Sequence, residues 1–402
     1  MMKINILRGQ DQIGGSIIEI STATTRIILD AGVELDEGEQ IMIPEIGGLF
    51  SGEKAYDAVF VSHYHADHMG LLNHVLKGIP IYMGEKAYRI ASAASEYLRR
   101  EISFVPNFIL DEQPITIGDI QLTPISCDHS AFDSYMFLIE VGGKTLLYTG
   151  DFRANGRLGD EELLKTLPQV DGLIIEGTTL SREDDRENIE EEFLEEIAVN
   201  YLDKHNGPAF VWTSAMNIDR IITAYNIAER SGRVFLEDIY TASVATAAGS
   251  DIPQPNGKYP ARVFTTGGDR QYELLQQFGA AKIGKKAIAK QPFVMCVRPS
   301  MKSYLSKLNE LCSFEDGVLF YAMWKGYLEQ PSMQTFVDFM ESKGVRLHML
   351  HTSGHADAQT IDRLVSAVCP KVIVPVHTEN ASWFDRYKNF ATIIHAQKQI
   401  EI

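Results

Sequence analysis

Short apolar runs of about the length of a β-strand recur along the chain. At the N-terminus, the runs at residues 3–8, 16–20 and 26–29 are separated by glycine and Ser/Thr turns, as in a β-meander. Further runs of this kind lie at residues 56–62, 120–126, 134–141, 144–149 and 172–176. Residues 1–180 are therefore expected to form a first domain rich in β-strands.

After residue 180 the pattern changes to apolar strands that alternate with helices. Alternation of this length predicts a mostly parallel sheet covered by helices, and we interpret residues 181–345 as a second domain inserted into the first. Residues 346–402 are expected to re-enter the first domain and complete it. This part contains a predicted helix at 358–368, a second at 381–389 and a last strand at 393–402.

A cluster of polar side chains follows the apolar run at 56–62. Within six positions the sequence places His63, His65, Asp67 and His68, where a buried strand is expected to open into a loop. Neutral imidazole and carboxylate suit zinc or manganese better than calcium or magnesium. The alternative is a polar surface loop with chance histidines, but crowding of so scarce a residue favours a metal site.

Other strand-length runs also end in residues that can bind a metal or exchange a proton. These residues are His129, Asp151, Glu176, His355 and His377. Asp151 follows a glycine, which lets the backbone approach closely, so it is suited to bridge two metals or to remain a solvated turn residue. Asp30 is equally suited to cap a turn or to hold a ligand histidine.

The composition sets limits on location and partners. The 402 residues include no apolar segment long enough to cross a membrane and no signal-peptide core near Met1, so a cytoplasmic protein without a membrane partner is expected. The four cysteines are widely spaced, which argues against a zinc ribbon or disulfide framework. The net charge of −17 argues against avid non-specific binding to nucleic acid, while leaving room for a local basic cleft.

The ordered series of strand-end motifs resembles the metallo-β-lactamase fold, an αββα sandwich with two metals at one sheet edge. The motif His63-x-His65-x-Asp67-His68 comes first, and His129 and Asp151 follow in the same order as in that fold. The later motifs, at Glu176, His355 and His377, look like those of the β-CASP branch, which contains ribonuclease J and related RNA-processing nucleases. The resemblance thus implies an α/β protein in which a metallo-β-lactamase sandwich carries an inserted α/β β-CASP domain.

The resemblance also implies a set of ligands for two Zn²⁺ ions, with Mn²⁺ as the alternative. One ion would be bound by His63, His65 and His129, the other by Asp67, His68 and His377, and Asp151 would bridge them. Two metals about 3.5–4 Å apart would hold a hydroxide for in-line attack on a phosphodiester. Asp30 matches an aspartate that supports such ligands.

The expected catalytic residues are Asp67, Glu176 and His355. His355 is the candidate proton donor to the leaving oxygen, and Glu176 could hydrogen-bond it and raise its pKa. Substrate binding is assigned to Ser353, Gly354 and His355, because a tight turn before a helix offers hydroxyl and backbone N–H donors for a phosphate.

Single-stranded RNA is the favoured substrate, and a ribonuclease J-like hydrolase is the favoured function. Residues 176–179 read Glu-Gly-Thr-Thr, where ribonuclease J usually has Asp-Ser-Thr-Asn, so the choice between endonuclease and exonuclease stays open. The alternatives are a phosphodiesterase acting on DNA or a small phosphodiester, and a non-catalytic subunit of an RNA-processing complex. The sequence also leaves open whether the protein is a homo-oligomer.

Overall fold

The structure is a computed structural model that describes residues 1–35, 41–182, 188–267, 269–395 and 399–402. The chain divides into two compact units. The first unit comprises Met1–Tyr88, Glu101–Asn188 and Gly354–Ile402, and the second comprises Arg89–Arg100 and Ile189–Ser353. Among the described residues, no helix is both long enough and apolar enough to span a membrane.

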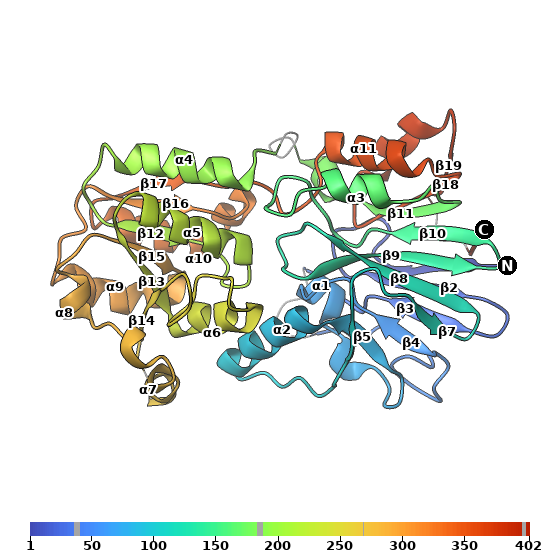
Figure 1. Ribbon diagram of the computed structural model, residues 1–402, viewed down its shortest axis with the longest axis horizontal. Coiled ribbons are helices and arrows are strands. Elements are labelled where there is room, and N and C mark those ends of the chain that lie inside the picture. Colours follow the sequence, from blue (N-terminus) through green and yellow to red (C-terminus); the bar gives the residue numbers. More distant parts are fainter. Residues whose placement is uncertain (36–40, 183–187, 268, 396–398) are drawn as a thin grey trace. The chain divides into compact units, whose positions relative to one another are not determined.

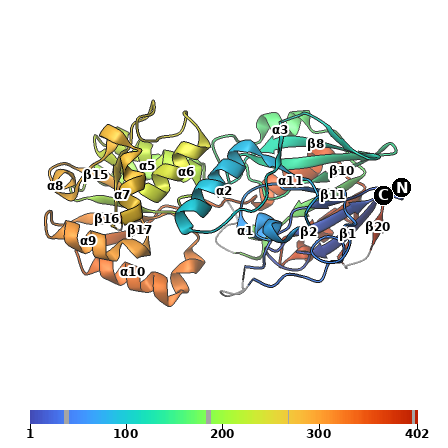
Figure 2. The same cartoon turned by 90° about the horizontal axis from the view of Figure 1, so that it is seen from below.

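Two seven-stranded sheets form the first unit (Figure 1). The first sheet has the order β20 (Ile400–Glu401), β1 (Lys3–Arg8), β2 (Ile17–Ser21), β3 (Arg26–Leu29), β4 (Ala58–Phe60), β5 (Ile81–Gly84) and β6 (Asn107–Ile109). The second has the order β19 (Thr392–Ile393), β18 (Val372–Val376), β11 (Gly172–Glu176), β10 (Lys144–Tyr148), β9 (Ser134–Val141), β8 (Ile120–Cys127) and β7 (Ile115–Ile117). Pairing of β20 with β1 brings the two chain ends together (Figure 2).

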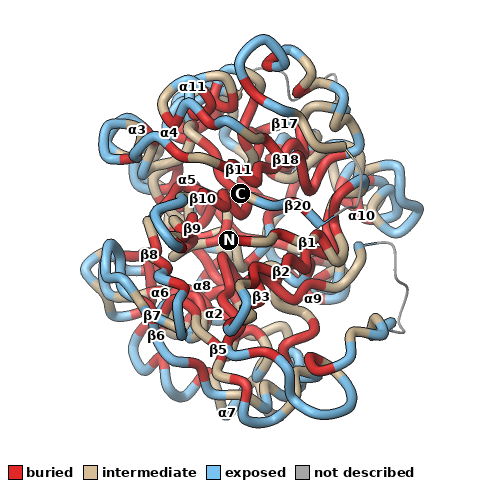
Figure 3. The backbone as a smooth tube through the Cα atoms, turned by 90° about the vertical axis from the view of Figure 1, so that its right-hand side faces the viewer, coloured by how far each residue is buried: buried red, intermediate tan, exposed pale blue. Residues whose placement is uncertain are grey.

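The alternation of side chains along each strand of the second sheet supplies two hydrophobic cores. In β10, Leu146 and Tyr148 face the core between the two sheets, whereas Leu147 faces the other side. In β11, Ile174 likewise belongs to the core between the sheets. Figure 3 shows the strands of both sheets as largely buried, because each sheet is covered on both faces.

Helices cover the outer faces of this pair of sheets. Helix α11 (Ala358–Val368) buries the stripe Ile361, Leu364, Val365 and Val368, which packs with the outer face of the second sheet. Helix α3 (Glu161–Thr166) lies on the same side in Figure 1. On the side of the first sheet lie α1 (Ala66–Met69) and the start of α2 (Glu85–Leu98). The predicted αββα sandwich is thus confirmed.

The second unit is built on one six-stranded sheet in which every pair of neighbouring strands is parallel. Its strand order is β14 (Arg262–Phe264), β13 (Val234–Asp238), β15 (Phe293–Val297), β12 (Ala209–Trp212), β16 (Gly317–Tyr321) and β17 (Val345–Met349). Its helices are α4 (Glu191–Leu202), α5 (Ile218–Arg230), α6 (Ile239–Ala248), α7 (Asp269–Gln276), α8 (Lys285–Ile288), α9 (Lys302–Asn309) and α10 (Pro331–Glu341). The predicted strand–helix alternation and mostly parallel sheet are confirmed.

Some predicted elements take a different form. Residues 381–387 form a 3₁₀ helix, η6 (Ala381–Tyr387), where an α-helix was predicted at 381–389. The predicted strand at 393–402 is two short strands, β19 and β20, and residues 396–398 lie outside the described part. Strand β17 pairs with β16 and thus lies in the second unit, which continues to Ser353. The domain ranges 1–180, 181–345 and 346–402 stay predictions.

Candidate metal centre

The candidate ligands lie where strands of the first unit end. His63 and His65 lie in the loop after β4, and α1 carries Asp67 and His68. His129 follows β8, Asp151 follows β10 and His377 follows β18. Because β10, β11 and β18 are parallel neighbours, their carboxyl ends meet at one edge of the second sheet. Residues more than 300 positions apart in the sequence are thereby brought together.

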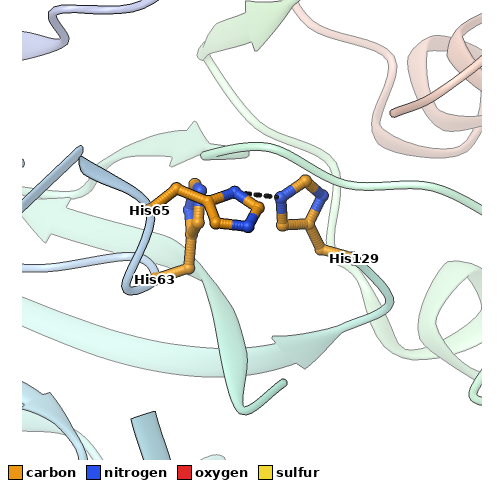
Figure 4. Close-up of side chains that lie close together, drawn as sticks. All are labelled: His63, His65 and His129. Atoms are coloured by element: carbon orange, nitrogen blue, oxygen red, sulfur yellow. Dashed lines mark hydrogen bonds between the residues drawn. The ribbon is translucent and has the colours of Figure 1, made fainter. Parts of the chain in front are cut away.

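One group of possible ligands consists of His63, His65 and His129 (Figure 4). One ring nitrogen of each lies within 4.8 Å of one ring nitrogen of the others. His65 Nδ1 lies 3.1 Å from His129 Nε2, which is the contact drawn in Figure 4. Burial lowers the pKa of His65 to about 4 and also lowers the pKa of the other two. Neutral imidazole, the form that ligates metal, is therefore favoured.

The second group consists of Asp67, His68, Asp151 and His377, all of them buried. His68 Nε2 lies 3.3 Å from Asp151 Oδ2, and His377 Nε2 lies 3.2 Å from Asp67 Oδ2. Asp151 Oδ2 also lies 3.8 Å from His63 Nε2, so this carboxylate is close to both groups. Burial would raise the pKa of Asp151, but His377, His68 and His355 outweigh it and lower that pKa well below its usual range.

Asp30 determines which ring nitrogen carries the hydrogen in two candidate ligand histidines. Its Oδ2 lies 2.8 Å from His68 Nδ1, and because a carboxylate only accepts, that nitrogen donates; in the neutral ring Nε2 then keeps its lone pair. The Ser62 hydroxyl also donates to Oδ2, over 2.8 Å, which leaves its oxygen to accept from His63 Nδ1 at 3.0 Å. The Tyr148 hydroxyl donates to the same Oδ2 over 2.6 Å. Asp30 thus holds candidate ligand histidines, which is the second of the two roles considered for it.

Two further contacts orient ligand histidines from outside. His129 Nδ1 donates to the carbonyl oxygen of Gly354 over 2.5 Å, which leaves Nε2 as the free base. Thr178 Oγ1 lies 2.8 Å from His377 Nδ1. Sequence reasoning missed Thr178, Ser62 and Tyr148, although Ser62 and Thr178 lie two residues after β4 and β11, and Tyr148 is the last residue of β10. For Ser62, the available signal was its hydroxyl directly before the candidate ligand His63.

Polar atoms without partners test whether metal ions fit here. Among the described residues, His63 Nε2, His68 Nε2 and both carboxylate oxygens of Asp151 are buried and make no hydrogen bond of ordinary geometry. Leaving a buried polar group unsatisfied costs roughly 1–3 kcal/mol. These atoms face one another, and metal ions would satisfy all of them. Imidazole and carboxylate donors of this kind suit zinc or manganese, so the residues fit bound metal.

A third group joins Glu176 and His355 to Asp151. His355 Nδ1 lies 3.3 Å from Glu176 Oε1 and 3.5 Å from Asp151 Oδ2. Glu176 is held by the backbone N–H groups of Phe152 and Thr178, over 3.0 and 3.1 Å. Burial alone would lower the pKa of His355, but the carboxylates of Glu176 and Asp151 outweigh it and raise that pKa. The imidazole is thereby kept ready to hold a proton.

The residues assigned to substrate binding differ in their surroundings. Gly354 packs closely in the first unit, since a Cβ there would lie 2.5 Å from Ser130 Oγ. Asn188 Nδ2 donates to the carbonyl oxygen of His355 over 2.9 Å. Ser353 is buried and is the last residue of the second unit. The structure thus gathers all seven candidate ligands with Glu176 and His355, while the roles of these residues and of Ser353 and Gly354 stay predictions.

Comparison with protein families matches two segments of the chain. Residues 25–205 match the beta-lactamase superfamily domain, and residues 344–388 match the Zn-dependent metallo-hydrolase RNA specificity domain. Six of the seven candidate ligands lie in the first segment, and the seventh, His377, lies in the second. The two matches thus cover the whole candidate metal centre.

Similar proteins include several named for RNA cleavage. An RNase J-like protein of Methanocaldococcus jannaschii is 30% identical over 60% of this chain and 58% of its own length. Ribonuclease J of Helicobacter pylori is 27% identical over 38% of this chain and 23% of its own length. Ribonuclease J of Sinorhizobium meliloti is 21% identical over 88% of this chain and 64% of its own length. The chain spans less than two thirds of the length of each of these relatives.

A solved structure supports the fold over the whole chain. A protein of unknown function from Enterococcus faecalis superposes with a TM-score of 0.81 and covers 100% of both chains. Its sequence is 20% identical, so this likeness concerns the fold alone.

Proposed function

We propose that the chain is a member of the metallo-β-lactamase superfamily, in its ribonuclease J-like β-CASP branch, and that it hydrolyses phosphodiester bonds of RNA. The observation that carries the proposal is the buried Asp151 carboxylate, which makes no hydrogen bond within the described chain and lies close to two groups of metal-binding side chains. The RNA specificity domain match and the names of the relatives favour RNA over other phosphodiesters.

The proposed cofactor is a pair of Zn²⁺ ions, with Mn²⁺ as the alternative. His63, His65 and His129 would hold one ion, Asp67, His68 and His377 the other, and Asp151 both. When bound, the ions would supply an activated water as nucleophile and neutralise charge on the phosphate under attack. The seven candidate ligand side chains follow four strands, β4, β8, β10 and β18, so the fold itself would hold the two groups of ligands next to each other.

The proton for the leaving oxygen is assigned to His355. Its raised pKa keeps a proton on the ring, and Glu176 accepts a hydrogen bond from Nδ1, which leaves Nε2 to face the leaving group. Asp67 is proposed as a ligand with a catalytic role. Its pKa is lowered because the hydrogen bond from His377 and nearby histidines outweigh the effect of burial, so it stays a carboxylate that can accept a hydrogen bond from water and orient it.

The second unit is proposed to be the inserted β-CASP domain, and the Ser353-Gly354-His355 segment to contact a substrate phosphate. A cytoplasmic location and a homo-oligomer remain expectations from the sequence alone.

The test is cleavage of single-stranded RNA by purified protein of known metal content. End-labelled RNA with a 5′-monophosphate, 5′-triphosphate or 5′-hydroxyl would be compared with the equivalent DNA and with a chromogenic phosphodiester. We expect RNA to be cleaved, with activity lost on chelation and restored by Zn²⁺ or Mn²⁺. Cleavage of the chromogenic compound alone would contradict the RNA assignment, and protein that takes up no transition metal would contradict the whole proposal.

A further inference from the structure

A long stretch of the second unit departs from the acidic character of the chain. The 36 residues at 274–309 contain no Asp or Glu, although the chain as a whole has a net charge of −17. The cations of this stretch are Lys282, Lys285, Lys286, Lys290, Arg298, Lys302 and Lys307. An acidic shell would repel polyanions, so a concentrated positive stretch is where a polyanion would approach this unit.

Part of this stretch surrounds a cavity of about 360 Å³. The cavity lies at the amino ends of β13 and β14 and beside α8, which Figure 1 labels at the left. Its polar lining comes from Arg262, Lys282 and Gln291, and its apolar lining from Val234, Ile283 and Ala287. We call this hollow the basic cavity. Its size is near the lower end of the range for small-ligand pockets, roughly 300–1,000 Å³.

The lysines beside the cavity extend its positive charge. Lys286 and Lys290 are exposed and four positions apart, and each directly precedes a residue of the cavity lining, Ala287 or Gln291. Lys286 lies in α8, and Lys290 lies in the turn that follows it, which is closed by a hydrogen bond from Lys290 N to the carbonyl oxygen of Ala287. Both lysines thus adjoin the cavity lining along the chain and add positive charge beside it.

These cations have no acidic partners within the described part of the chain. Lys282 Nζ donates to Gln276 Oε1 over 2.8 Å, and Arg262 donates to the carbonyl oxygen of Lys282 over 3.2 Å. Both partners are neutral. Neither of these residues, nor Lys286 or Lys290, takes part in an ion pair with a described residue, whereas other basic side chains of the unit do, such as Arg230 with Glu195. Four positive charges thus remain available to a ligand.

We propose that the basic cavity binds the sugar-phosphate backbone of single-stranded RNA, with one nucleotide in the hollow and adjoining phosphates on Lys286 and Lys290. The choice of RNA as the polyanion rests on the proposed function. Arg262 and Lys282 supply the cations for the enclosed phosphate, and Gln291 supplies an amide. Within the described part of the chain no aromatic side chain lines the hollow, so base stacking does not contribute there and binding is expected to be independent of sequence.

Binding measured without cleavage tests the proposal. The full-length protein is kept in EDTA, and a fluorescently labelled, unstructured RNA of about 20 nucleotides is titrated by anisotropy at several salt concentrations. The variant is Lys286→Glu with Lys290→Glu. The control has the same change of charge at two other exposed lysines, Lys77→Glu with Lys204→Glu. All four positions are on the surface, and circular dichroism checks that each protein is folded.

We expect the Lys286/Lys290 variant to bind RNA at least about tenfold more weakly, and the slope of log K against log salt to become shallower by about 1.4, since each phosphate contact on a single strand contributes about 0.7. The control should differ little from the wild type. A second variant, Arg262→Gln, changes a residue of the cavity lining and leaves the surface lysines intact. It should also weaken RNA binding, which tests the role of the basic cavity itself.

Equal affinity and salt slope in wild type and variant would overturn the proposal. Binding to vesicles that contain phosphatidylglycerol is measured for the same proteins. If the Lys286/Lys290 variant lost binding to these vesicles but kept its affinity for RNA, the proposal would also be overturned, because the surface would then recognise lipid. The outcome is separate from that of the proposed function. If the protein cleaves RNA but the Lys286/Lys290 variant binds RNA as the wild type does, the proposed function holds and the basic cavity is contradicted. If the variant loses RNA binding but the wild type cleaves no RNA, the basic cavity is supported and the proposed function is contradicted.

Discussion

A substitution of His355 can test proton transfer without removing one of the proposed metal ligands. His355 touches Glu176 and Asp151, yet the two main groups of ligand side chains are complete without it. We predict that His355→Asn retains its metal content but loses activity by about 10²–10⁴-fold, the range for removal of a general acid. Turnover of RNA and metal content by mass spectrometry would be measured on the same sample.

The matched control for this substitution is His74→Asn. His74 is exposed and lies outside the three groups of metal-binding side chains, so its replacement should leave both activity and metal content unchanged. Near-normal activity in His355→Asn would show that another group, or water, protonates the leaving oxygen.

Thr178 tests how far a contact outside the ligand set controls metal affinity. Its hydroxyl lies 2.8 Å from His377 Nδ1, in a fully buried position. Thr178→Val keeps the shape and removes this hydrogen bond, so we predict that affinity for one of the two ions falls about 10–100-fold. Competition with a chromogenic chelator measures it, and Thr178→Ser, which keeps the hydroxyl, should restore the affinity. Unchanged affinity in the Val variant would mean that packing alone orients His377.

For single residues, the sequence predicted the candidate metal ligands well but their hydrogen-bond partners poorly. His63, His65 and His68 stood out because histidine is scarce and rarely crowded. The role of Asp30 stayed open, since a turn cap and a histidine partner leave the same trace in a sequence. Only the fold brings it within 2.8 Å of His68. Thr178 had no signal of its own, because threonine after a strand is common.

Among the secondary-structure elements, α1 depends on a close approach of two backbone segments. A Cβ on Gly32 would lie 1.6 Å from the carbonyl oxygen of Asp67, a backbone atom that cannot move without shifting α1 and its ligands. We predict that Gly32→Ala lowers the melting temperature and the metal content together. Differential scanning fluorimetry and metal analysis would measure the two.

Gly47→Ala is the control for this prediction. Gly47 is exposed, and a Cβ there would meet nothing within 4 Å. Its melting temperature should stay close to that of the wild type. If Gly32→Ala also kept its metal and its melting temperature, α1 would have to move more freely than the packing around Asp67 indicates.

The elements that the sequence predicted well are those with strong periodicity. Helix α11 begins and ends at the predicted residues, 358 and 368, because its apolar stripe is regular and Asp357 caps its N-terminus by accepting from Thr360 N. The segment at 381–389 has helix-forming residues but becomes η6, a 3₁₀ helix. Its buried residues, Phe384 and Tyr387, are three apart, which matches the 3₁₀ repeat.

For the whole molecule, net charge was the least informative summary. The value of −17 correctly describes an acidic protein, yet it conceals a stretch of 36 residues with seven cations and no acid. Averages over a chain of two units cannot locate such a stretch. The parallel sheet was predictable because side-chain periodicity is local, and the sandwich was implied by the family resemblance of the strand-end motifs. The cavity beside α8, in contrast, depends on the packing of β13, β14 and α8 together.

Stability without metal should depend on pH through the buried histidines. The pKa of His65 is about 4 in the folded chain and about 6.5 when unfolded, so between these values the unfolded chain binds more protons. The sign follows: the free energy of unfolding falls as the pH is lowered from 6.5 to 4, by up to about 3 kcal/mol from this group. The lowered pKa values of His63 and His129 act in the same direction, while the raised pKa values of His68 and His355 oppose it.

Urea unfolding of chelator-treated protein at several pH values isolates the contribution of His65. The His65→Gln variant removes only this titration, so its stability should fall less than that of the wild type over the same interval. Zn²⁺ should stabilise the wild type by mass action and flatten the dependence near neutral pH, because bound metal holds the imidazoles unprotonated. Parallel curves for the two metal-free proteins would mean that His65 is hydrated and titrates normally, which its part-buried contact with His129 argues against.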